Sequence, residues 1–105
     1  MDALDKPLQR ILSGFIRMHI LHHAAEGGVY GNWMIEELRH HGYRISAGTI
    51  YPLLRGMERD GWLAGKTEKG GARRTLYRIT PAGRRALREA RTRLNELFRE
   101  TVARK

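Results

Sequence analysis

The sequence predicts a mainly α-helical fold that contains one small β-hairpin. Three stretches before residue 61 and one after residue 80 repeat apolar side chains every three or four positions, as helices with a buried face do. Between them, two short runs rich in aromatic and β-branched residues flank a Gly-Gly pair, which indicates two strands joined by a turn. The chain has 105 residues, which suits one compact domain.

The first helix is expected at about residues 5–26, with Pro7 in its opening turn, where a missing N–H costs little. Its apolar side chains cover more than one helical stripe, whereas a surface helix needs only one. Two stripes indicate two neighbours: the core of this chain and, as a candidate, a partner chain. Gly27 and Gly28 are expected to end the helix.

The second and third helices are expected at about residues 31–40 and 46–60, with Gly42 in the turn between them. Ser46 has the character of an N-cap, whose hydroxyl accepts a backbone N–H of the first turn. Ile50, Leu54 and neighbouring apolar residues recur at helical spacing and should face the core. Pro52 sits late for a helix start, so it should cost a hydrogen bond or bend the first turns.

The period then changes, and residues 62–66 and 75–80 are expected to form the two strands of a hairpin within residues 62–80. Thr80 and Pro81 then form an N-cap followed by a proline at the first helical position, which begins the last helix. Two helices joined by a short turn and followed by a two-stranded hairpin form a winged helix-turn-helix. We therefore expect this domain at residues 1–80 and a long dimerisation helix at residues 81–105, packed together as one compact domain.

The last helix carries an apolar stripe at three-four spacing that no further segment of the chain remains to cover. A second copy of the chain is the simplest partner that could cover this stripe, so the sequence predicts a homodimer. The residues expected at the dimer interface come from the first and last helices. They are Leu8, Phe15, Leu87, Leu94, Leu97 and Phe98.

The charge balance narrows the choice of partners. Twenty Lys and Arg side chains against 11 Asp and Glu leave a net charge of +9, which favours nucleic acid or an anionic membrane surface as a partner. No stretch is apolar enough to span a bilayer, so we expect no membrane partner. The absence of cysteine excludes disulfides and thiol catalysis and fits a cytoplasmic protein. No catalytic constellation stands out, so we expect neither an enzyme nor a bound cofactor.

Four blocks of the sequence, residues 29–31, 45–54, 57–63 and 75–83, resemble the PadR family of transcriptional regulators. The run Gly-Thr-Ile-Tyr-Pro-Leu-Leu at residues 48–54 is the distinctive one, and the resemblance covers about residues 8–90. The short tail resembles the subfamily with a single C-terminal helix. Asn32 departs from the pattern because an aromatic residue is common there, and Gly56 makes the third helix looser than usual.

The resemblance implies a homodimeric DNA-binding regulator, usually a repressor, with the third helix in the major groove and the hairpin wing on the DNA backbone. Some members release DNA when a planar hydrophobic ligand binds between the first and last helices. Candidate pocket residues here are Phe15, Met18, Leu94 and Phe98, and the alternative is a closed dimer interface without a ligand.

The candidate DNA-binding residues fall into two groups. Those at the third helix offer hydrogen bonds, a close backbone approach at Gly48, and an Arg55 guanidinium suited to a guanine edge or a phosphate. Those in the wing supply charge around a flexible tip, although an ordinary solvated hairpin is the alternative. For Tyr51, a half-buried packing role is the alternative. The candidates are Ser46, Gly48, Thr49, Tyr51, Pro52, Arg55, Lys66, Lys69, Arg73 and Arg74.

Two questions stay open at this level. A winged helix can also serve as a protein-interaction module that binds no DNA, and an RNA partner is disfavoured because the A-form major groove is too narrow to read. The histidines lie at helical spacings that would permit a metal site, but no carboxylate partner is obvious, although Glu26 is near, so we expect no metal. Their role is left open; they are His19, His22, His23, His40 and His41.

Overall fold

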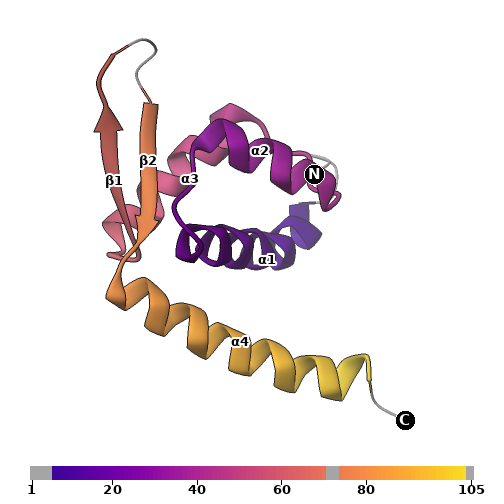
Figure 1. Cartoon of the computed structure of the whole chain (residues 1–105). Helices are drawn as coiled ribbons and strands as arrows, with labels where there is room; N and C mark the ends of the chain where they lie inside the picture. The colour runs from indigo at the N-terminus through magenta and orange to yellow at the C-terminus, as the bar shows by residue number, and fades with distance from the viewer. Residues whose placement is uncertain (1–5, 71–73, 104–105) are drawn as a thin grey trace.

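The computed structural model describes residues 6–70 and 74–103, and it confirms the mainly α-helical fold with one hairpin. The element order is α1 (Lys6–Ala25), α2 (Gly31–His40), α3 (Ala47–Arg59), β1 (Leu63–Glu68), β2 (Arg74–Ile79) and α4 (Pro81–Thr101). Figure 1 shows α1, α2 and α3 forming the body, with the hairpin standing at one side of it. None of the helices in these two ranges is long and apolar enough to cross a membrane.

The hairpin is anchored to the segment that joins α1 to α2. Its two strands pair antiparallel, from Leu63 opposite Ile79 at the base to Glu68 opposite Arg74. The Val29 N–H donates to the Tyr77 carbonyl (2.8 Å), and the Tyr77 N–H donates back to the Val29 carbonyl (2.9 Å). This bridge fixes the wing against the helical body. An isolated two-stranded hairpin is only marginally stable in water, so the attachment stabilises the wing.

One apolar core joins all the elements. Each helix of the body contributes fully buried side chains, the hairpin contributes Leu63 and Tyr77, and α4 contributes Leu87. Burying one such aliphatic side chain contributes roughly 1.5–3 kcal/mol. The helical members are Ile16, Ile20, Leu21, Ala24, Met34, Leu38, Ile50, Leu54 and Met57.

The helix starts agree with the predicted positions, but one cap differs in its chemistry. At α4, Thr80 Oγ1 accepts from the Gly83 N–H (3.0 Å) and Pro81 takes the first helical position, as expected. At α3, Ser46 is the N-cap residue, but its side chain makes no capping hydrogen bond. Its hydroxyl lies 3.5 Å from Thr49 Oγ1, and only its backbone carbonyl bonds the first turn. The expected Ser46 side-chain cap is therefore wrong.

Helix α4 has two halves with different surroundings. Gly83 and Leu87 in the first half are buried against the body. Every residue of the second half, from 91 onward, is exposed, and this half runs past α1 and beyond the body (Figure 1). A helix that leaves its own core in this way leaves its apolar side chains uncovered.

Candidate nucleic-acid interface

Helix α3 presents one apolar face to the core and the opposite face to solvent. Ile50, Leu54 and Met57 are buried on the inner side. The predicted DNA-binding residues of this helix region are exposed except for Tyr51, which is half-buried. The exposed ones are Ser46, Gly48, Thr49, Pro52 and Arg55. Pro52 lies inside the helix on the solvent side. There the ring is accommodated at the loss of one backbone hydrogen bond.

Tyr51 connects α3 to the start of α2. Its hydroxyl donates to Asn32 Oδ1 (2.8 Å), and its ring lies directly over Gly31. A Cβ atom on Gly31 would clash with Tyr51 Cε1, and glycine avoids this clash. Tyr51 thus has the packing role that was considered as its alternative, and its hydroxyl is hydrogen-bonded to Asn32.

A groove separates α3 from the wing and brings residues of both to one surface. It is lined by side chains from the start of α2, from α3 and from β2. Arg55 of α3 and Arg74 of β2 both line it, together with Tyr51 and Thr75. The middle of α3 and strand β2 therefore lie side by side on one side of the molecule.

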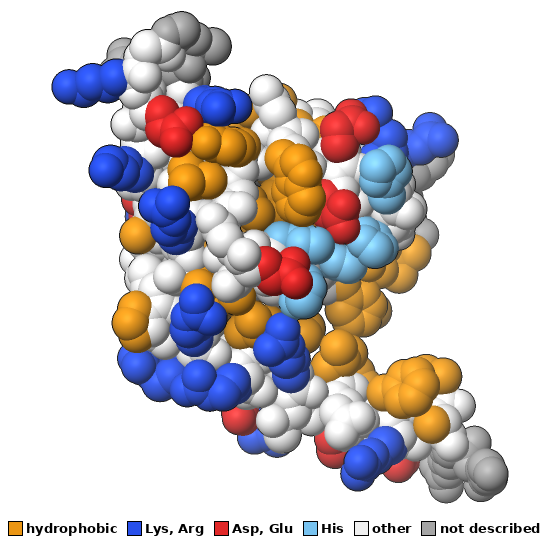
Figure 2. Space-filling model, viewed as in Figure 1, with side chains coloured by type: hydrophobic (Ala, Val, Ile, Leu, Met, Phe, Trp, Pro, Cys, Tyr) orange, Lys and Arg blue, Asp and Glu red, His pale blue; other side chains and the backbone are white. Residues whose placement is uncertain are grey.

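The wing carries its exposed cations along both strands. Of the cations expected to contact DNA, Lys66, Lys69 and Arg74 are exposed, while Arg73 lies outside the described residues. Arg78, which the sequence reasoning passed over, shares a hollow with Lys66 and Lys69. The signal for it was available, since strand alternation places it on the same face as Arg74. Figure 2 shows Lys and Arg side chains gathered along the hairpin side.

Arg74 is held by two residues that sequence reasoning missed. Its Nε donates to Glu68 Oε1 (3.2 Å), and its guanidinium carbon lies 4.1 Å from the centroid of the Tyr30 ring. The Tyr30 hydroxyl donates to the same Glu68 oxygen (2.8 Å), and this hydrogen bond raises the pKa of Tyr30. Nothing local signals a contact between residues 30 and 68, because only the folded hairpin brings them together.

Glu58 fixes the distance between α3 and the wing. Its Oε2 accepts a hydrogen bond from the Gly65 N–H (2.9 Å), which joins the last turn of α3 to β1. Because the hairpin is also paired with Val29, both of its strands are attached to the body. Helix α3 and the wing therefore have a defined relative position.

The residues expected at the dimer interface and in the ligand pocket lie on α1 and α4. Leu8, Leu94, Leu97 and Phe98 are 41–50% exposed, and Phe15 is half-buried. Leu87 differs, because it is only 3% exposed and belongs to the core of its own chain. Of the pocket candidates, Phe15, Met18 and Leu94 line one hollow of about 450 Å³ between α1 and α4, and Phe98 is not among its lining residues.

A comparison with protein-family models matches residues 20–89 to the model described as "Transcriptional regulator PadR-like family". The chain belongs to the PadR-like family of transcriptional regulators. The resemblance seen in the sequence is thereby confirmed, and so is the expectation that this is a regulator of transcription rather than an enzyme. Membership in this family carries DNA binding as its shared activity.

Similar transcriptional regulators span nearly the same length. Transcriptional regulator Rv3488 of Mycobacterium tuberculosis is 51% identical over 88 residues, covering 83% of this chain and 82% of that protein. A PadR-like transcription factor from Bacteroides fragilis superposes with a TM-score of 0.79 at 26% identity, covering 94% of this chain and 97% of the other. A PadR family transcriptional regulator from Eggerthella lenta superposes with a TM-score of 0.71 at 33% identity, covering 90% of this chain and 88% of the other.

Proposed function

We propose that this PadR-like chain is a homodimeric repressor that binds specific sites in double-stranded DNA. Residues 1–80 would form the DNA-binding domain, and residues 81–105 the dimerisation helix. The observation that supports this most directly is the groove that Arg55 of α3 and Arg74 of the wing line together. A duplex laid across it would contact α3 and the cationic hairpin at once.

In this proposal α3 enters the major groove. Its first turn offers the hydroxyls of Ser46 and Thr49, and the N–H groups of a helix start favour a phosphate. Gly48 and the exposed Pro52 leave room for the DNA backbone, with only the Ser46 hydroxyl near Gly48. Arg55 reaches either a guanine edge, bonding O6 and N7 together, or a phosphate.

The wing supplies affinity that does not depend on sequence. Lys66, Lys69, Arg73 and Arg74 would neutralise phosphates and release counterions, with Arg78 as a further contributor. The Glu68 carboxylate and the Tyr30 ring position the Arg74 guanidinium, which is still 62% exposed on its side chain. An exposed but oriented cation is well suited to a phosphate contact.

The proposal is tested by measuring duplex binding against salt concentration, with fragments selected from genomic DNA by the protein itself. Log affinity should fall against log salt concentration by about 0.9 for each phosphate neutralised. Replacing Lys66, Lys69 and Arg74 by glutamine should weaken binding to all sequences and lower that slope by about 2–3.

The matched control removes the same amount of charge from the outer face of α4. Arg85, Arg88 and Arg99 are exposed there, and their replacement by glutamine should leave the slope nearly unchanged. No duplex binding at low salt would reject the proposal and favour a protein-interaction module. Repression is tested separately with a reporter placed behind a selected site, whose expression should rise when the regulator is deleted.

Dimerisation rests on the uncovered stripe of α4. Leu94, Leu97 and Phe98 are each 41–50% exposed on the part of the helix that leaves the body. Apolar side chains gathered on one projecting helix mark an interaction surface, and a second copy presents the same stripe in return. A two-fold dimer would then display two α3 helices to successive major grooves, about 34 Å apart.

The hollow between α1 and α4 is the candidate site for an effector. Phe15, Met18 and Leu94 give it apolar walls that suit a planar hydrophobic compound. A planar aromatic dye titrated into the protein should bind there, and Met18→Trp should block it by filling the hollow. Dye binding that Met18→Trp leaves unchanged would place the ligand elsewhere, and no dye binding by the wild-type protein would favour a closed dimer interface.

A further inference from the structure

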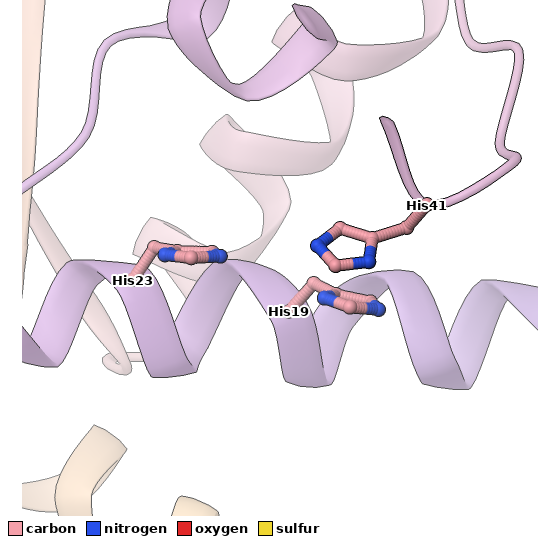
Figure 3. Close-up of side chains that lie close together, drawn as sticks. All are labelled: His19, His23 and His41. Carbon is pink, nitrogen blue, oxygen red and sulfur yellow. The ribbon is translucent and has the colours of Figure 1, made fainter. Parts of the chain in front are cut away.

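Three histidines meet a carboxylate where α1 faces the end of α2. Figure 3 shows His19 and His23 rising from successive turns of α1 toward His41, which follows the end of α2. The imidazole nitrogens available as ligands all lie within 4.8 Å of one another. His41 stacks at a tilt over His19, with ring centroids 4.6 Å apart.

Glu37 of α2 completes the cluster. Its Oε2 lies 3.1 Å from His23 Nε2 and 3.0 Å from His41 Nε2, so one oxygen already contacts imidazoles from two different elements. Two ligand atoms bound to one tetrahedral Zn²⁺ at about 2.0–2.1 Å are separated by about 3.3 Å. The Glu37 oxygen is thus spaced from both imidazoles much as ligands of one ion would be, and the nitrogens of His23 and His41 lie within 4.8 Å of that of His19.

The environment favours the protonation states that metal ligands need. Burial, with the nearby His41 and His23 adding to it, lowers the pKa of His19 and so keeps its imidazole neutral. The hydrogen bond from His41 lowers the pKa of Glu37 and keeps it ionised. Neutral imidazoles and a carboxylate are the forms that coordinate a cation.

We propose that His19, His23, His41 and Glu37 form a binding site for one divalent transition-metal ion of the Zn²⁺ class. Three imidazole nitrogens and one oxygen suit a borderline ion, whereas Mg²⁺ and Ca²⁺ prefer ligand sets made of oxygen. The sequence led us to expect no metal because no carboxylate partner was obvious in it. The fold supplies that partner from another helix.

The site joins the body of the protein to its helix-turn-helix. Helix α1 contributes two ligands, while Glu37 and His41 flank the last turn of α2, just before the turn that leads to α3. An ion held by all four would cross-link α1 to the end of α2. Binding to the folded state alone also raises the melting temperature.

The test is calorimetric titration of tag-free, chelator-treated full-length protein with ZnCl₂. We expect one ion per chain, a higher melting temperature with Zn²⁺, and the strong visible absorption of tetrahedral coordination when Co²⁺ is used instead. His41→Gln should weaken Zn²⁺ binding by about 100-fold or more, since even supporting residues of metal sites cost 10–100-fold. His40→Gln is the matched control. His40 is the exposed neighbour of His41 and lies outside the cluster, so its replacement should change the Zn²⁺ affinity little.

Three results would overturn the proposal. The first is no saturable Zn²⁺ binding by the wild-type protein, and the second is an equal loss in the His40 and His41 variants, which would indicate scattered surface histidines. The third is a loss on His22→Gln but not on His19→Gln, which would place the ion at the group of His22, His23 and Glu26. Melting curves of each variant without metal check that it is folded, and His19→Gln provides a second change within the cluster.

Discussion

Adding one methyl group at Gly48 should change the stability of the fold and the affinity for DNA in opposite directions. It is the second residue of α3, it is exposed, and a Cβ atom added there would meet only Ser46 Oγ, at an ordinary distance of 3.6 Å. Its φ angle is not positive, so alanine fits the backbone without strain. Alanine is preferred over glycine in a helix by up to about 1 kcal/mol. Gly48→Ala should therefore stabilise the free protein.

The same methyl group should weaken DNA binding if the start of α3 approaches the duplex closely. Forcing one extra methyl group into a packed contact costs typically 1–3 kcal/mol, and 1.4 kcal/mol is about tenfold in affinity. We thus expect a melting temperature higher by a few degrees, at about 4–8 °C per kcal/mol, together with affinity lower by about tenfold. Thermal unfolding and fluorescence anisotropy with a selected duplex measure the two effects.

Gly56→Ala is the control within the same helix. A Cβ atom there would meet only the flexible end of Arg59, at 3.5 Å, two turns away from the leading end of α3. It should stabilise the protein to a similar degree and leave DNA affinity unchanged. The reasoning is refuted if Gly48→Ala binds DNA as well as the wild type does, because α3 would then not be inserted by its first turn.

Three further changes test other parts of the structure. Leu94→Asp with Leu97→Asp should convert a dimer into monomers in a sedimentation run, whereas a wild-type monomer at micromolar concentration would contradict the proposed interface. Gly83→Ala should destabilise the fold by about 1–3 kcal/mol in urea unfolding, because its Cβ would clash with the backbone carbonyl oxygen of Trp62; full stability would show that the contact relaxes easily. Burial and the nearby His41 lower the pKa of His19, so the unfolded chain binds more protons and stability falls as the pH drops below about 6.5. His19→Gln should make that fall shallower, and an unchanged pH profile would rule this source out.

The sequence by itself determined the elements and their order, because the signals that begin and end them are local. Thr80 and Pro81 satisfy the first N–H groups of α4 within one turn, and the turn after α2 uses Gly42, whose φ is +89°. Apolar spacing identified the inner face of α3 in the same way. The family motifs lie within these segments, so the class of protein could also be predicted.

Only the tertiary structure decided which side chains meet across elements. The stripe on α4 has one period throughout, yet Leu87 is in the core and Leu94 is exposed, because the body ends between them. The contacts of Glu68 with Tyr30 and of Glu37 with His23 join residues that are distant in the chain. Spacing along a helix defines a face, but the neighbour of that face depends on how the helices pack, and packing is a property of the whole fold.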